Sequence, residues 1–80
     1  MITPAEAEKL AHSTLEKYIN SCNCGTVEDV GKVLLKLLSM TGLALNATQG
    51  QANAVAAIES VALHVGKPKY AKAASLHRLN

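Results

Sequence analysis

Two cysteines separated by one residue, Cys22 and Cys24, are the first side chains in this sequence that could carry chemistry. Thiolates can ligate a soft metal, but a structural zinc site needs four ligands and usually has two residues between paired cysteines. Completing a site would require His12, His64 or His77 to converge on the pair, or a second subunit to donate its own pair. We therefore expect the two cysteines to lie in a turn, and we keep a thiol or metal-binding module as an alternative function.

The spacing around His12 is a second candidate for chemistry. Glu8 and Glu16 lie four residues to either side of it, so a helix would place all three side chains along one edge. That arrangement could support acid–base chemistry, but a solvated helix edge offers the same spacing. No Ser-His-Asp or Cys-His arrangement and no phosphate-binding glycine loop is suggested. We expect no catalytic residue and no cofactor, and we do not expect an enzyme.

A basic segment forms the C-terminal end of the chain. Residues 1–66 carry a net charge of −2, whereas residues 67–80 carry +4 without a single acid. The positive charges are those of Lys67, Lys69, Lys72 and Arg78, and Tyr70 lies among them. These side chains could contact phosphates while the tyrosine ring stacks on a base, or they could meet an acidic protein surface. They could also simply keep an apolar bundle soluble.

The elements that must position these side chains are helices. Thr3, Pro4 and Glu6 predict the start of a first helix, because Thr3 can cap, proline suits the first helical position and Glu6 can complete a capping box. Apolar residues then recur at spacings of three and four up to Ile19. A polar run ending in Gly25 predicts the turn that follows.

A helical hairpin is predicted for the centre of the chain, with helices over residues 27–45 and 49–65 joined near residues 46–48. Thr26 with Asp29 predicts the start of its first helix, and Thr48 with Gln51 has the capping-box spacing for its second. Gly66 marks its end, followed by a proline. We predict a domain over residues 1–66 and, over 67–80, a basic tail or a short fourth helix.

Two glycines within the longest predicted helix suggest an interaction surface. Gly31 and Gly42 each cost about 1 kcal/mol relative to alanine in a helix, and Leu35 lies between them, outside the main apolar arc. Close approach of another backbone would account for both glycines, and the three residues would then form a shallow shelf. Alternatively, Gly42 ends or bends the helix.

The composition favours binding to another chain. Hydrophobic residues are 49% of the 80 residues and charged residues 18%, with two tyrosines and no phenylalanine or tryptophan, and the mean hydropathy is +0.13. Some of this apolar surface is expected to face another subunit or a partner. The apolar run over residues 30–45 is interrupted by Lys32 and Lys36 and is shorter than the roughly 20 residues that a membrane span needs. We predict no membrane span and no signal peptide, and therefore a cytoplasmic protein.

These observations predict an all-α fold, a three-helix unit whose surplus apolar surface is buried by pairing with a second copy into a bundle. The predicted function is that of a small non-enzymatic interaction protein, a regulator or inhibitor of a larger protein. Chains of this type are frequent among phage and mobile-element accessory proteins. The partner-binding residues would be those of the shelf and of the basic segment: Gly31, Leu35, Gly42, Lys67, Lys69, Tyr70, Lys72 and Arg78. Nucleic-acid binding through the basic segment is the alternative.

Overall fold

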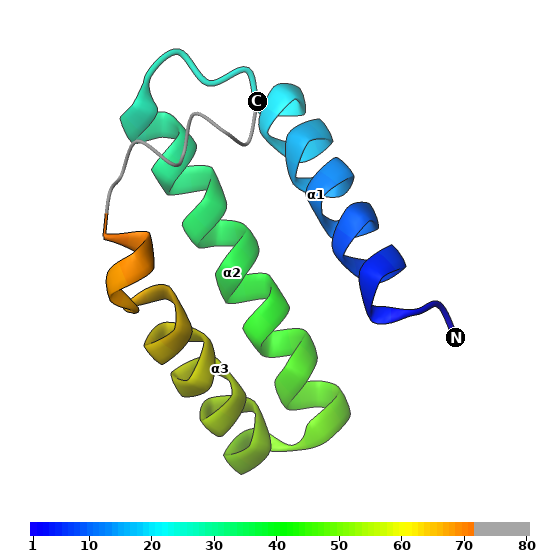
Figure 1. Ribbon diagram of the computed structural model, residues 1–80. Helices are drawn as coiled ribbons and strands as arrows, with labels where there is room; N and C mark the ends of the chain where they lie inside the picture. The colour runs from blue at the N-terminus through cyan, green and yellow to red at the C-terminus, as the bar shows by residue number, and fades with distance from the viewer. Residues whose placement is uncertain (72–80) are drawn as a thin grey trace.

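The computed structural model describes residues 1–71, which form three α-helices and one short 3₁₀ turn (Figure 1). The first helix, α1, spans Pro4–Ser21 and begins as predicted. The Glu6 amide donates to the Thr3 hydroxyl at 3.2 Å, and the Thr3 amide donates to the Glu6 carboxylate at 3.1 Å. This hydrogen bond from the Thr3 amide, together with one from its hydroxyl, holds the pKa of Glu6 below its usual value of 4.5. Local polar chemistry thus determines where α1 starts.

The second helix, α2, spans Val27–Gln49 and is the longest element. Its predicted start is confirmed, because the Thr26 hydroxyl accepts from the Asp29 amide at 3.1 Å. Its predicted end is wrong: the helix runs through Gly42 and through residues 46–48, where the hairpin turn was expected. The Thr48 hydroxyl donates to the Ala44 carbonyl at 2.9 Å, four residues back along the same helix, so Thr48 does not cap a new one.

The corner between α2 and α3 is made by one residue, Gly50. Its φ of 87° and ψ of 154° are conformations that side-chain-bearing residues rarely adopt. The third helix, α3, spans Gln51–Val65 and starts without a side-chain cap, so the predicted capping box between Thr48 and Gln51 does not form. Beyond Gly66 a 3₁₀ turn, η1, spans Pro68–Tyr70. Most of the predicted short fourth helix, over residues 67–80, lies outside the described residues.

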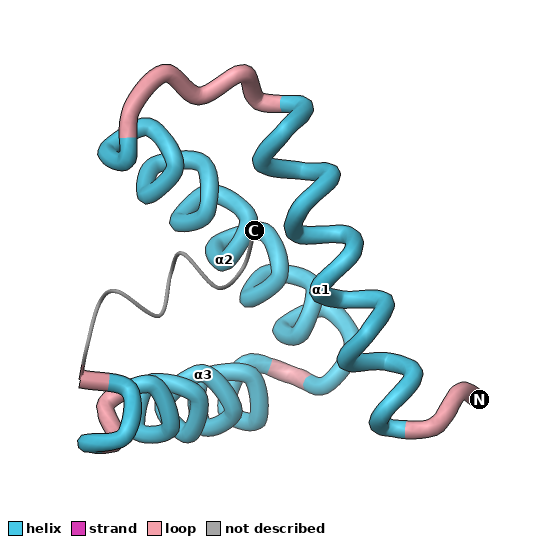
Figure 2. The backbone as a smooth tube through the Cα atoms, turned by 45° about the horizontal axis from the view of Figure 1, so that its top comes forward, coloured by secondary structure: helices cyan, strands magenta, loops and turns pink. Residues whose placement is uncertain are grey.

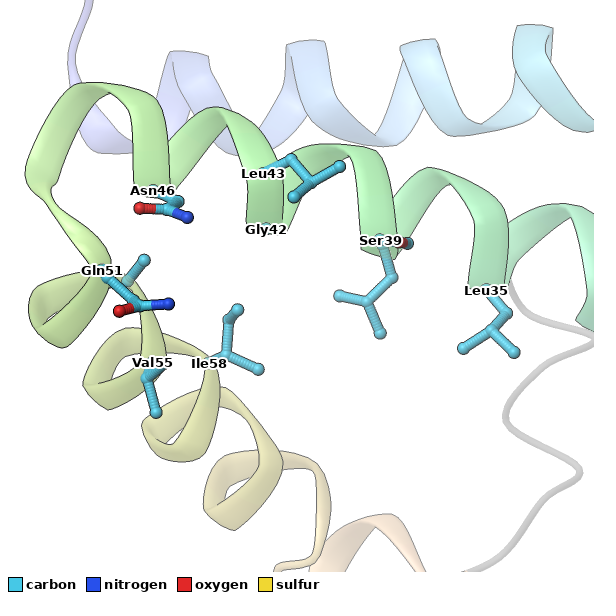
Figure 3. Close-up of a pocket in the computed structure, with 10 residues that line it drawn as sticks. Leu35, Ser39, Gly42, Leu43, Asn46, Gln51, Val55 and Ile58 are labelled. Atoms are coloured by element: carbon cyan, nitrogen blue, oxygen red, sulfur yellow. The ribbon is translucent and has the colours of Figure 1, made fainter.

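Helix α2 lies in the middle of the molecule, with α1 on one side of it and α3 on the other (Figure 1). Half-buried Leu15, Tyr18 and Ile19 share one face of α1. The Tyr18 hydroxyl donates to the backbone carbonyl of Val33 in α2 at 2.7 Å, which identifies that face as the one towards α2. On the other side, α3 meets α2 at the Gly50 corner and diverges from it (Figures 2 and 3).

This arrangement leaves very little core. Ala54 is the only fully buried residue among residues 1–71. The Cα radius of gyration is 13.9 Å, whereas a compact domain of this length has about 11.6 Å. The all-α, three-helix prediction is confirmed, but the helices are splayed. Pairing into a bundle, and a boundary at residue 66, remain predictions.

Candidate interaction surface

An apolar groove lies between α2 and α3, opening away from the Gly50 corner (Figure 3). Its volume is about 370 Å³. We call it the α2–α3 groove; its lining carries no charged side chain and consists of Leu35, Leu38, Ser39, Gly42, Leu43, Asn46, Gln51, Ala54, Val55 and Ile58. An uncharged concave surface of this kind binds apolar side chains rather than ions.

The exposure of α3 shows how the groove widens. Ala54, Ile58, Val61 and Val65 follow one another at spacings of four, three and four, so they form one stripe along the helix. Their exposed fractions rise along the helix, from 3% at Ala54 to 37% at Ile58, 53% at Val61 and 63% at Val65. The stripe therefore leaves α2 progressively, and its last two valines are open to the surroundings.

The predicted shelf on α2 faces this groove. Leu35 and Gly42 both line it, and at 100° per residue Gly31 lies on the same face. A Cβ atom added to Gly42 would lie 3.1 Å from Cδ1 of Ile58, so Gly42 marks a close approach between α2 and α3. A Cβ atom on Gly31 would meet no atom within 4 Å. Close approach of another helix therefore accounts for Gly42, while nothing in the described part of the chain approaches Gly31.

The amount of exposed surface is larger than a compact monomer of this size would show. The chain exposes 6835 Å², whereas a compact monomer of 8.4 kDa exposes about 4,600 Å². Residues 72–80, even counted as fully exposed, account for at most about 1,400 Å² of the difference of about 2,200 Å². The three helices therefore expose at least about 800 Å² beyond a compact fold, which is roughly one partner's share of a standard protein interface.

The basic residues of the described chain lie directly after α3. Lys67 precedes the turn η1, and the Lys69 ammonium lies 5.1 Å from the centre of the Tyr70 ring. The His64 ring meets the same tyrosine edge-on, with 5.2 Å between ring centres. The structure thus brings two predicted partner-binding residues, Lys69 and Tyr70, into contact beside the open end of α3. Lys72 and Arg78 lie outside the described residues.

The two cysteines lie in the α1–α2 turn, as expected, and both are half-buried free thiols. Burial is the main cause that raises the pKa of Cys24, and neighbouring Cys22 and Asp29 raise it further. Burial and the same two thiols also raise the pKa of Tyr18. A raised pKa lowers the thiolate fraction of Cys24, and the thiolate is the nucleophilic form. Within residues 1–71 no three His, Cys, Asp or Glu side chains converge into a group that could hold a metal.

His12 lies on an exposed edge of α1, as its spacing suggested. Its Nδ1 atom is 3.4 Å from the Glu16 carboxylate, and both side chains are about half exposed. Such surface pairs contribute at most a few tenths of a kcal/mol in helices. The contact is that of a solvated helix edge.

Helix α2 is long and apolar enough to cross a membrane by length and composition alone. With 23 residues it spans about 34 Å, so the shortness of the apolar run no longer argues against a span. The core helix of a water-soluble bundle passes the same criterion. Lys32 and Lys36 interrupt the apolar sequence of α2, and the absence of a membrane span remains a prediction.

Sequence reasoning missed most of the α2–α3 groove. Of its lining, Leu35 and Gly42 were predicted as partner-binding residues, whereas Leu38, Leu43, Val55 and Ile58 were given no role in a site. A usable signal was present, because positions 35, 38 and 42 recur at helical spacing just as 51, 54, 55 and 58 do.

Comparison with known protein families, with curated proteins and with solved structures finds no match to this chain.

Proposed function

We propose that this protein is a small non-enzymatic interaction protein that binds and modulates a larger protein or assembly, as a regulator or inhibitor. The observation that supports the proposal best is the accessible surface of the helices, which exceeds that of a compact fold by at least about 800 Å² and includes many large apolar side chains. Leaving many large apolar side chains in water is unfavourable, and contiguous exposed apolar patches usually mark interaction sites.

The basic end of the chain is the proposed contact for the larger partner. Lys67 and Lys69 follow α3, whose one formally charged residue is Glu59. Lys72 and Arg78 extend the positive charge in the sequence. Charges at the rim of an apolar surface select a partner of opposite charge and accelerate the encounter. We therefore propose a partner with an acidic surface.

Charge reversal tests the proposal. A tagged chain with Lys67→Glu and Lys69→Glu should lose a specific partner that the unchanged chain retains from a detergent-free lysate of its source. The matched control is Lys9→Glu with Lys17→Glu, which reverses two exposed lysines on α1 and should keep the partner. Loss in both double variants would mean that net charge rather than the basic end governs binding.

Recovery of the chain from the membrane fraction alone would contradict the proposed cytoplasmic location.

Nucleic-acid binding is the second candidate, favoured by Tyr70, which is partly exposed between lysines. However, Lys69 already lies over that ring, so a stacking base would have to displace it on that side. A mobility-shift titration with non-specific DNA and RNA at two salt concentrations separates the candidates. Tight, steeply salt-dependent binding would favour nucleic acid, because phosphate contacts release counterions. No shift at low salt would exclude it.

A thiol or metal module through Cys22 and Cys24 is the third candidate. Metal binding would have to displace the proton of the Cys24 thiol, whose pKa is raised in the metal-free chain. Elemental analysis of protein purified under reducing conditions gives the test: stoichiometric zinc or copper would support this module.

A further inference from the structure

We infer that α3 of a second copy of this chain fills the α2–α3 groove, so that two α2–α3 hairpins form a two-fold symmetric four-helix core. The inference goes beyond the proposed function, because it concerns the purified protein alone. Each copy would place its α3 in the groove of the other, as an isologous interface requires.

The shape of the groove determines what can fill it. The α3 stripe loses contact with α2 from Ile58 towards Val65, so the open space runs along about two helical turns. From the Gly50 corner as far as Leu35 and Ile58, the walls are mainly apolar and carry no charged side chain. The occupant must therefore be an apolar helix with few charges, narrow enough to enter between two helices that meet at Gly50.

Helix α3 itself meets these requirements. Its 15 residues include five alanines, which keep it narrow, and its one formal charge is that of Glu59. The exposed stripe ending in Val61 and Val65 needs a partner, and the uncharged groove sets no like charges against each other when two copies pair. The same surface thus carries both a groove and an apolar ridge of matching chemistry.

Gly31 supplies a second observation. Gly42, on the same face of α2, lies where α3 of its own chain approaches closely, since a Cβ atom added there would be 3.1 Å from the Ile58 side chain. Gly31 lies eleven residues earlier, where the two helices have separated, and a Cβ atom added there would meet no atom of residues 1–71 within 4 Å. A helix from a second copy entering the groove would reach Gly31 in the way that α3 reaches Gly42.

The exposed area agrees with a dimer. A standard interface buries about 800 Å² on each partner, and the described helices expose at least about that much beyond a compact fold. Small domains without disulfides or metals commonly gain their missing core by self-association.

Light scattering on the full chain, over about 1 to 200 µM, tests the inference in the range where dimers of this interface size form. The unchanged protein should show twice its mass of 8.4 kDa, and its melting temperature should rise with concentration. Leu35→Glu, which places a charge in the groove, should raise the dissociation constant at least about tenfold without loss of helical signal. The matched control is Leu10→Glu on α1, because Leu10 is as exposed as Leu35, 61% against 66%, and lies outside the groove; it should leave the mass unchanged.

Gly31→Leu provides a second variant, because a Cβ atom at Gly31 would meet no atom of residues 1–71 within 4 Å. It should weaken dimerisation by blocking the close approach of α3 of the second copy to α2. If Leu35→Glu unfolds, Gly31→Leu tests the inference in its place. A single-chain mass at every concentration would overturn the inference, as would a dimer that tolerates both groove variants or loses mass equally in Leu10→Glu. Self-association that appears only after residues 72–80 are deleted would also overturn it, since the chain's own end would then cover the groove. None of these results depends on whether a larger partner is captured, so the two proposals can fail separately.

Discussion

Replacing Tyr18 by phenylalanine tests how α1 is held against α2. The Tyr18 hydroxyl donates to the Val33 carbonyl at 2.7 Å, and within residues 1–71 this is the one side-chain hydrogen bond that joins two α-helices far apart in sequence. Phenylalanine keeps the ring and removes the hydroxyl. Val33 lies within α2, so its carbonyl remains in the hydrogen-bond ladder of the helix and is not left without a donor.

The expected loss is therefore that of one neutral, partly buried hydrogen bond, about 1 kcal/mol. This energy corresponds to about a fivefold larger population of molecules in which α1 has left α2. Hydrogen exchange followed by mass spectrometry measures that population, because peptides from α1 and from α3 report separately. Amides of α1 should exchange about five times faster in Tyr18→Phe, whereas those of α3 should be unchanged.

Tyr70→Phe is the matched control. Tyr70 is the chain's other tyrosine, and its hydroxyl has no hydrogen-bond partner in the described part of the chain. It should leave exchange in α1 unaltered. Unchanged α1 exchange in Tyr18→Phe would show that the hydrogen bond does not hold the helix. Equal acceleration in all three helices would show that α1 does not open independently of the hairpin.

Two further predictions concern the local chemistry of turns and caps. Gly50→Ala should lower the free energy of unfolding by about 1–3 kcal/mol in urea denaturation, because alanine is strained at a φ of 87°; Gly66→Ala, at a φ of −79°, should be nearly neutral. The second concerns pH: since the pKa of Glu6 is lowered in the fold, its stabilisation of α1 is complete above about pH 4.5 and is lost as pH falls through the lower folded value. Circular dichroism should show this acid step in the unchanged chain and not in Glu6→Gln, and identical acid profiles would contradict it.

The helix starts could be predicted because they depend on residues three positions apart. Thr3 and Glu6 form the complete capping box that their spacing indicated. At the second start the shorter acid, Asp29, accepts from the Gly25 amide at 3.2 Å instead of from the cap residue. The Thr26 hydroxyl still accepts from the Asp29 amide, so the helix begins where predicted. Local hydrogen bonds of this kind need no tertiary information.

The end of α2 was predicted four residues too early, at residue 45 instead of Gln49, because two local preferences compete there. Thr48 was interpreted as a cap, but its hydroxyl bonds to the Ala44 carbonyl within α2, and the helix continues until Gly50 permits a positive φ. The glycine was the better signal, since glycine commonly ends helices in this way. Threonine satisfies its hydroxyl inside a helix or at its start, so its presence alone does not mark a boundary.

The interhelical geometry could not be predicted from periodicity. A helical pattern shows which sides of α2 are apolar, but it does not show which neighbour covers each side or at what angle. The main apolar arc of α2 includes Val33, which α1 contacts, whereas α3 lies on the side of Leu35 and Gly42 that was assigned to an outside partner. The presence of an interaction surface was inferred from composition, but the position of that surface on the helices depends on tertiary packing.

The use of opposite sides of α2 by α1 and α3 has a consequence for stability. In a three-helix bundle each helix packs on the other two and encloses a shared core, but here α1 and α3 lie on either side of α2 and each contacts mainly α2 (Figure 1). Each contact is then a two-helix contact with one open flank, and just one residue of the described chain, Ala54, is fully buried. In the proposed dimer the four helices of two hairpins would close the α2–α3 side, while α1 would remain a peripheral element held largely by Tyr18. Dilution below the dissociation constant of the dimer should therefore expose the α2–α3 groove to water before it affects the contact between α1 and α2.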